Sequence, residues 1–124
     1  MPLYPGTGHA RERGKGRGAG ATLNVPLSPG DGDDRFLAGL TRELVPAMEN
    51  FRPEFVLVSA GFDAHGADPL GGLRVSTDAF AEATRVVRGI ADRFASGRIV
   101  SALEGGYDLE ALAASSAIHL DALF

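Results

Sequence analysis

The chain has 124 residues, of which 44% are hydrophobic, and this length suits one globular domain with a modest core. Its formal charge of −4 is opposite to the basic surface of most nucleic-acid-binding modules, so we expect no nucleic-acid partner. There is no cysteine, which excludes disulfides and thiolate metal sites, and no apolar run approaches the roughly 20 residues of a membrane span. With no signal-peptide pattern at the N-terminus, we expect a cytoplasmic protein that does not associate with membranes.

The N-terminal region is rich in glycine. Residues 4–20 contain six glycines, which predicts an irregular segment with many turns. The next segment, Thr22–Leu27, is β-prone and is followed closely by Pro29, so we expect a short first strand there.

A helix and a strand are predicted in the middle of the chain. Between Leu37 and Phe51 the apolar residues recur at steps of three and four, which indicates an amphipathic helix. Asp33 or Asp34 is the expected cap of this helix, and Pro46 is expected to kink it or to limit its straight part. Phe55–Ser59 is a continuous apolar run, which predicts a strand buried on both faces.

The remaining elements continue the alternation of strands and helices. A helix is predicted to begin near residues 76–77 and to end at Gly97, followed by a strand over Ile99–Leu103. Asp108 is positioned to cap a last helix that runs to Leu123. The order strand, helix, strand, helix, strand, helix indicates an α/β fold with parallel strands, whose ligands bind at the carboxyl ends of the strands.

The segment that follows the second predicted strand contains two candidate metal ligands. Asp63 and His65 are two residues apart, so in extended backbone both side chains would point to one side, and a hard or borderline cation accepts both types of ligand. Alternatively, Asp63 caps a turn and His65 lies on the surface. The spacing alone leaves both interpretations open.

The segment that follows the third predicted strand is Glu104–Asp108. Gly105 and Gly106 would let the backbone approach a ligand closely, and the phenol of Tyr107 could donate a hydrogen bond to a developing oxyanion. A tight turn with Tyr107 packed on the sheet edge is the alternative. His119, on the last helix, is interpreted as structural or exposed.

Taken together and in order, five segments resemble the C-terminal half of the catalytic domain of the histone deacetylase and acetylpolyamine amidohydrolase family. They cover nearly the whole chain and are YPGTG from Tyr4, the glycine-rich run that leads into TLNVPL, FRPEFVLVSAGFDAH from Phe51, DPLGGL from Asp68, and LEGGYD from Leu103. The resemblance implies a three-layer arginase-like α/β fold with a parallel sheet, of which residues 1–124 would form the incomplete C-terminal portion, and zinc-dependent hydrolysis of an acetylated amine.

The resemblance also assigns roles to individual residues. Asp63 matches a zinc ligand of the family, and Tyr107 matches the tyrosine that polarises the scissile carbonyl and stabilises the oxyanion. Leu70, Gly105 and Gly106 match positions that line the narrow acyl channel. His65 matches no ligand position of the family.

Other parts of the family's site have no counterpart in this chain. The two further zinc ligands and a pair of histidines lie upstream in the family, and the three histidines here include no adjacent pair. We therefore expect a fragment that is inactive alone, with exposed apolar edges, acting on acetyl-lysine or an acetylated small amine when completed by an N-terminal half. The alternatives are a non-catalytic module that forms oligomers or binds a partner and, more remotely, an arginase-like hydrolase.

Overall fold

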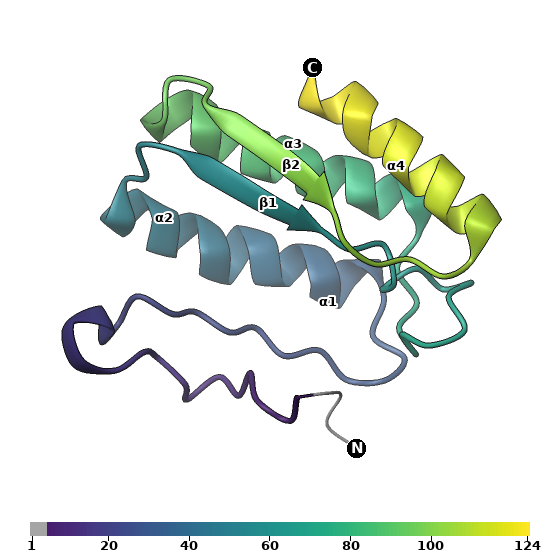
Figure 1. Ribbon diagram of the computed structural model, residues 1–124, viewed down its shortest axis with the longest axis horizontal. Helices are drawn as coiled ribbons and strands as arrows, with labels where there is room; N and C mark the ends of the chain where they lie inside the picture. Colours follow the sequence, from purple (N-terminus) through teal and green to yellow (C-terminus); the bar gives the residue numbers. More distant parts are fainter. Residues whose placement is uncertain (1–4) are drawn as a thin grey trace.

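The computed structural model describes residues 5–124, so Tyr4 lies outside the described residues. After a 3-10 turn at Gly16–Gly18, the chain forms helices and two strands in the order shown in Figure 1. The elements are α1 (Asp33–Ala38), a π-helical turn (Gly39–Leu44), α2 (Val45–Phe51), β1 (Val56–Ala60), α3 (Thr77–Phe94), β2 (Ile99–Leu103) and α4 (Leu109–Leu123). No helix among these residues is long and apolar enough to cross a membrane.

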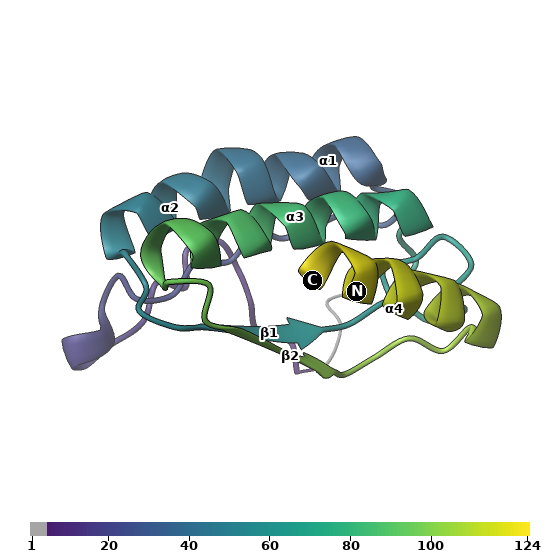
Figure 2. The same ribbon diagram turned by 90° about the horizontal axis from the view of Figure 1, so that it is seen from above.

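The two strands form a parallel sheet, as predicted. They pair in register from Val56 opposite Ile99 to Ala60 opposite Leu103. Because parallel strands need a crossover connection, the chain between them forms α3, which packs against the sheet. The four helices lie on the same side of the sheet (Figure 2), so the described residues form two layers.

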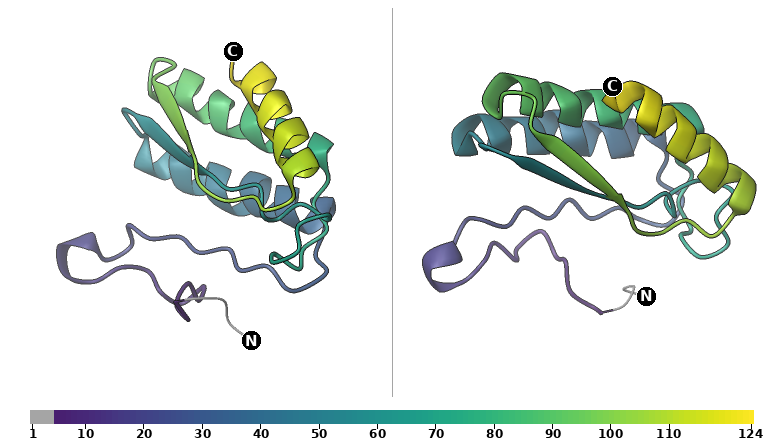
Figure 3. Two further views of the ribbon diagram at one scale, coloured as in Figure 1. Left: turned by 45° about the vertical axis from the view of Figure 1, so that its right-hand side comes forward. Right: turned by 45° about the horizontal axis from the view of Figure 1, so that its top comes forward.

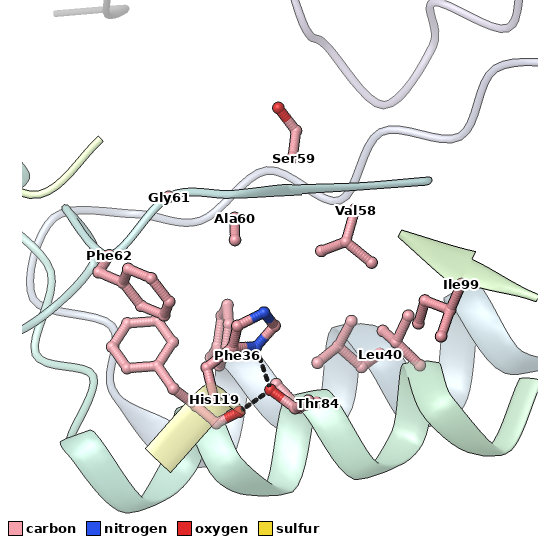
Figure 4. A pocket seen from close by; sticks show the side chains of 13 residues that line it. Phe36, Leu40, Val58, Ser59, Ala60, Gly61, Phe62, Thr84, Ile99 and His119 are labelled. Carbon is pink, nitrogen blue, oxygen red and sulfur yellow. Dashed lines mark hydrogen bonds between the residues drawn. The ribbon is translucent and has the colours of Figure 1, made fainter. Parts of the chain in front are cut away.

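The two faces of the sheet differ in burial, and the prediction that the first of these strands is buried on both faces is wrong for the described chain. Residues of β1 alternate between partly buried and exposed. Val58 and Ala60 point towards the helices, whereas Ser59 points away from them (Figure 4). Leu57 is 77% exposed and Val100 is 51% exposed on the open face. The open face of the sheet therefore exposes apolar side chains, which is a different feature from the apolar edges that the sequence predicts.

The predicted strand at Thr22–Leu27 does not form. This segment lies apart from β1 (Figure 3), and no described strand pairs with its backbone. Its alternate residues Leu23, Val25 and Leu27 instead face the π-helical turn and line a shallow pocket with Leu40. A β-prone sequence becomes a strand only when a neighbour supplies the ladder of hydrogen bonds.

The predicted helix in the middle of the chain is present, but its cap was wrongly assigned. Gly32 occupies the N-cap position without a side-chain hydrogen bond, and Asp33 is the first helical residue. The Asp33 carboxylate instead accepts hydrogen bonds of 2.7 Å from both the backbone N–H and the hydroxyl of Ser76. The irregular part of the helix is the π-helical turn just before Pro46, where the wider winding accommodates a residue that has no N–H to donate.

The last two helices begin where the sequence predicts. The Ser76 hydroxyl accepts the Ala79 N–H at the start of α3, and the Asp108 carboxylate accepts the Ala111 N–H at the start of α4. α3 ends at Phe94, and Gly97 closes its C-terminus with a positive φ of 73°. These caps are local signals, which is why the sequence alone locates them.

His119 on α4 is buried and structural. Its Nδ1 lies 2.7 Å from the Thr84 hydroxyl of α3, and its Nε2 lies 2.8 Å from the Ser101 hydroxyl of β2. Because the Thr84 hydroxyl donates to the Phe80 carbonyl, it must accept from His119 Nδ1–H. Figure 4 shows the His119 ring beside Phe62 in a cavity of about 250 Å³ between the sheet and the helices. Burial lowers the pKa of His119 below its ordinary value of 6.5.

Candidate active site at the carboxyl ends of the strands

The segments that follow β1 and β2 remain side by side after the strands end. The Glu104 N–H donates to the Ala60 carbonyl at 3.0 Å, and the Phe62 N–H donates to the Gly105 carbonyl at 2.8 Å. These two bonds continue the parallel ladder beyond the strands. They hold Asp63, which follows Phe62, against the main chain of Gly105.

The Asp63 carboxylate occupies a space that only glycine neighbours leave open. A Cβ atom at Gly61 would lie 2.9 Å from Asp63 Oδ1, and a Cβ atom at Gly105 would lie 2.7 Å from Oδ2. Within residues 5–124 this carboxylate accepts no hydrogen bond from another side chain or from the backbone, in contrast to Asp33 and Asp68. Its oxygens therefore remain available to a ligand.

A closed metal site is not formed by the described part of the chain alone. No group of three or more His, Asp or Glu side chains gathers there at a distance suited to one ion. A zinc site uses at least three protein ligands. Asp63 fits the role of one ligand in its charge, its free oxygens and its glycine cradle, and the remaining ligands would have to come from elsewhere.

His65, the other candidate ligand, is engaged within the fold. The Ala67 N–H donates to its Nδ1 at 3.0 Å, so its Nε2 carries the proton and donates to the Thr77 hydroxyl at 3.0 Å. Its ring is stacked on Phe80, with 6.4 Å between the centroids. Both nitrogens are thus engaged, Nδ1 within the loop and Nε2 with α3, and the ring is half-buried rather than free on the surface.

The two predicted site side chains that carry no charge project into solvent. Leu70 is 65% exposed and Tyr107 is 58% exposed. The main chain before Tyr107 has a conformation suited to glycine, because Gly106 has a φ of +136°. A Cβ atom at Gly106 would also lie 2.9 Å from the Leu112 side chain. The tyrosine therefore stands at the end of a tightly packed glycine turn.

Asp68 connects the two segments that carry the predicted site residues. Its Oδ1 accepts the N–H groups of Leu70 at 2.8 Å and Gly71 at 2.9 Å, and its Oδ2 accepts the Tyr107 N–H at 2.8 Å. Burial raises the pKa of this carboxyl, but the three N–H donors, with a smaller contribution from His65, outweigh burial and hold the pKa below its usual range.

No role was predicted for Asp68 from the sequence, although two of the three N–H groups that its carboxylate accepts follow it closely in the chain. An aspartate before proline commonly accepts backbone N–H groups two and three residues further on, which is what Leu70 and Gly71 supply. The bond to Tyr107 spans 39 residues, and no local pattern predicts it.

The geometry places a carboxylate with free oxygens, a solvent-facing phenol and an exposed leucine at the carboxyl ends of two adjacent parallel strands. Ligand sites of open α/β sheets occupy this position. The fold and site thus define an α/β protein with a candidate binding or catalytic site at the carboxyl edge of its sheet.

Comparisons with known proteins identify the family. The family model described as the histone deacetylase domain matches residues 1–123. The chain belongs to the histone deacetylase family. Among its relatives, a "Probable deacetylase" of Archaeoglobus fulgidus is 42% identical over 110 residues, which are 89% of this chain and 31% of that protein. A "Histone deacetylase-like amidohydrolase" of Pseudomonas aeruginosa is 45% identical over 103 residues, which are 83% of this chain and 27% of that protein.

Solved structures give the same result. The crystal structure of the HDA15 HD domain superposes with a TM-score of 0.89 at 36% sequence identity, covering 97% of this chain and 33% of that one. The histone deacetylase Clr3 also superposes with a TM-score of 0.89, at 35% identity. The resemblance inferred from the five segments is therefore confirmed, and so is the α/β fold class. The chain spans only about a third or less of the length of the relatives it matches.

Proposed function

We propose that residues 1–124 form the C-terminal part of a zinc-dependent deacetylase catalytic domain, which hydrolyses the acetyl amide of acetyl-lysine or of an acetylated small amine. The observation that carries this proposal is the placement of Asp63 and Tyr107 on adjacent segments that a continued parallel ladder and Asp68 hold together. The names of the relatives, which are deacetylases and an amidohydrolase, support the reaction class.

In this proposal each site residue has a defined task. Asp63 would supply one ligand to zinc, which when bound polarises the amide carbonyl of the substrate. The hydroxyl of Tyr107 would donate a hydrogen bond to the carbonyl oxygen as negative charge develops on it. Leu70 would supply apolar contact for the acyl chain, and the glycine backbone at 105 and 106 would let that chain pass close to the sheet.

The site is incomplete in this chain, so its activity is best tested after completion. The chain would be combined with an N-terminal portion of a family member that carries the missing ligands, and deacetylation of a fluorogenic acetyl-lysine peptide would be measured with and without zinc. We expect zinc-dependent turnover only from the combination. An acetylated polyamine assayed in parallel would separate the two substrate classes.

The matched variants test the role assigned to the phenol. Tyr107→Phe removes one hydroxyl from the site and should lower kcat by roughly 10²–10³, as loss of an oxyanion donor does in other enzymes. Thr41→Val removes an exposed hydroxyl that donates to the Leu37 carbonyl within its own helix, and it should leave turnover unchanged. Equal turnover of the Tyr107→Phe and the unchanged chain would refute the assignment.

The open face of the sheet supports the same proposal. Leu57 and Val100, which lie opposite each other on the two strands, are both more than half exposed, which is unusual for strand residues of a free-standing domain. Since the relatives are at least three times as long as the region they share with this chain, we assign the cover of this face to the rest of the catalytic domain.

A second candidate function uses the same apolar face without catalysis. Two copies of this chain could bury it against each other, giving an oligomerising module. Size-exclusion chromatography with light scattering distinguishes the two: a stable homodimer that does not dissociate on addition of the N-terminal portion favours the module, whereas a 1:1 complex of the two portions favours the deacetylase.

A further inference from the structure

The positioning of Tyr107 depends on very few contacts of its own. Its side chain is 58% exposed, so packing alone does not fix the ring. The residue before it, Gly106, has a φ of +136°, in a region of backbone space where glycine moves with little steric restriction. The direction of the phenol is therefore set by the main chain at residue 107.

The main chain is anchored on both sides of Tyr107. On one side the Gly105 carbonyl accepts the Phe62 N–H at 2.8 Å, and on the other Asp108 caps α4. Between these anchors, the Tyr107 N–H makes a single bond, 2.8 Å long, to Oδ2 of Asp68. Without that bond the peptide unit between Gly106 and Tyr107 could rotate, and rotation would redirect the ring.

The same carboxylate also shapes the loop that carries Leu70. Oδ1 of Asp68 accepts the N–H groups of Leu70 and Gly71 and so closes a tight turn. This turn presses Gly71 onto the main chain of Asp63, where a Cβ atom at residue 71 would overlap the Asp63 carbonyl oxygen, at 1.7 Å. The Asp68 side chain thus bonds directly to the main chain of Leu70 and Tyr107, and it is linked to the main chain of Asp63 only through Gly71.

We propose that Asp68 is a positioning residue that fixes the Tyr107 main chain, and through it the phenol, relative to the Leu70 turn. This inference rests on the proposed function for its catalytic consequence, but the positioning itself can be measured without activity. Asp68 acts through Tyr107 and has no contact of its own with the reacting atoms.

Asp68→Asn separates the two tasks of the carboxylate. Asparagine retains one oxygen, which can still accept from Leu70 and Gly71, but it presents an NH₂ group to the Tyr107 N–H, and two donors cannot bond. The variant therefore loses the bond to Tyr107 and keeps the turn. Asp68→Ala loses both. Asp92→Asn is the matched control, because it removes a carboxylate that pairs only with Arg88, on the surface of α3.

The first test measures the Tyr107 amide directly. The chain contains only two tyrosines, so labelling with ¹⁵N-tyrosine gives two amide signals whose hydrogen exchange can be followed by NMR. Asp68→Asn should speed exchange at the Tyr107 amide by roughly 10- to 100-fold, the effect of losing a hydrogen bond to a charged acceptor. Asp92→Asn should leave it unchanged. Equal exchange rates in the Asp68→Asn and unchanged chains overturn the inference, whatever the activity.

The second test uses the enzyme completed with its N-terminal portion. Asp68→Asn should lower kcat and change KM less than twofold, whereas Asp68→Ala should lower kcat and also raise KM, because the Leu70 turn is then released. In a Tyr107→Phe background, Asp68→Asn should have no further effect on kcat. If it lowers kcat as much there as in the unchanged enzyme, Asp68 does not act through Tyr107 and the inference fails.

The two tests separate failure of the inference from failure of the proposed function. A completed enzyme without deacetylase turnover refutes the proposed function, and the exchange experiment then decides the positioning inference alone. A completed enzyme that is active, with Tyr107 exchange unaffected by Asp68→Asn, refutes the inference and leaves the proposed function standing.

Discussion

The region from β1 to α4 forms the secondary structure that its sequence predicts, whereas the segment that precedes α1 does not. Between Val56 and Leu123 both predicted strands and both predicted helices form, and both helices carry the expected caps. Among the described residues 5–32, a 3-10 turn at Gly16–Gly18 is the only helical element, and the β-prone segment Thr22–Leu27 stays unpaired. The two regions differ because β1 and β2 pair with each other, whereas the earlier segment has no described strand beside it.

The same difference appears in the packing. Phe62, Val75, Ala79 and Phe80 form the buried core, which lies directly beneath the candidate site. Before residue 33, the described apolar residues Leu23, Val25 and Leu27 line a surface pocket against the π-helical turn. We therefore expect the stability of this chain to come from the region after Phe55, and substitutions in the two regions should differ accordingly.

The largest effect is expected from removing a core aromatic ring. Phe62 is 4% exposed, and its ring contacts Phe80 at a centroid distance of 5.1 Å and His119 at 5.7 Å. Phe62→Ala should lower the free energy of unfolding by about 3–5 kcal/mol. The matched truncation in the other region, Val25→Ala, removes two methyl groups from a half-buried side chain and should cost less than about 1 kcal/mol. Urea unfolding followed by circular dichroism measures both, and similar losses would contradict the contrast.

A smaller effect is expected from adding one methyl group to a glycine. At Gly71 a Cβ atom would lie 1.7 Å from the Asp63 carbonyl oxygen, whereas at Gly18 nothing lies within 4 Å. Gly71→Ala must displace the main chain of Asp63 and should cost about 1–3 kcal/mol, as overpacking does in well-packed sites. Gly18→Ala should be nearly neutral. Thermal unfolding of the two variants compares them directly, and an unshifted melting temperature for Gly71→Ala would show that the loop yields freely.

The parts of the fold that sequence predicts are those encoded by near neighbours. The periodic apolar residues of α3, its Ser76 cap and the bounds of β2 all follow from residues within a few positions of each other. Asp33 was assigned to the wrong partner, because its hydrogen bonds reach Ser76, 43 residues away. The strand at Thr22–Leu27 was wrongly predicted for a related reason, since pairing depends on chain that is distant in sequence.

The same division between local and distant signals applies to the candidate site. That Asp63, Leu70, Gly105, Gly106 and Tyr107 belong together came from resemblance to a family, whereas the chemistry of Asp-x-His alone left metal binding open. The structure adds what neither source contained: the continued ladder that brings Gly105 to Asp63, and the single carboxylate of Asp68 that joins the two segments. The roles of Asp63, Leu70, Gly105, Gly106 and Tyr107 in zinc binding and catalysis remain predictions.

The smallest effect we predict concerns pH and tests whether α4 is part of the stable region. Burial lowers the pKa of His119, so the folded chain holds this ring neutral while the unfolded chain binds a proton below its ordinary pKa of 6.5. The stability from neutral His119 is therefore complete above pH 6.5 and is lost as the pH falls from there towards the lowered pKa of the folded state. The Asp68 carboxyl has its lowered pKa in a separate window, below 3.8.

His119→Gln gives the comparison that isolates this contribution. Glutamine can replace part of the bridge between Thr84 and Ser101 but does not titrate, so the variant should be less stable near neutral pH and should lose less stability between pH 6.5 and 5 than the unchanged chain. Urea midpoints measured in steps of pH provide the test. If both chains lose stability equally over this range, His119 is solvated in solution, and α4 would belong with the loosely held N-terminal segment rather than with the core beneath the site.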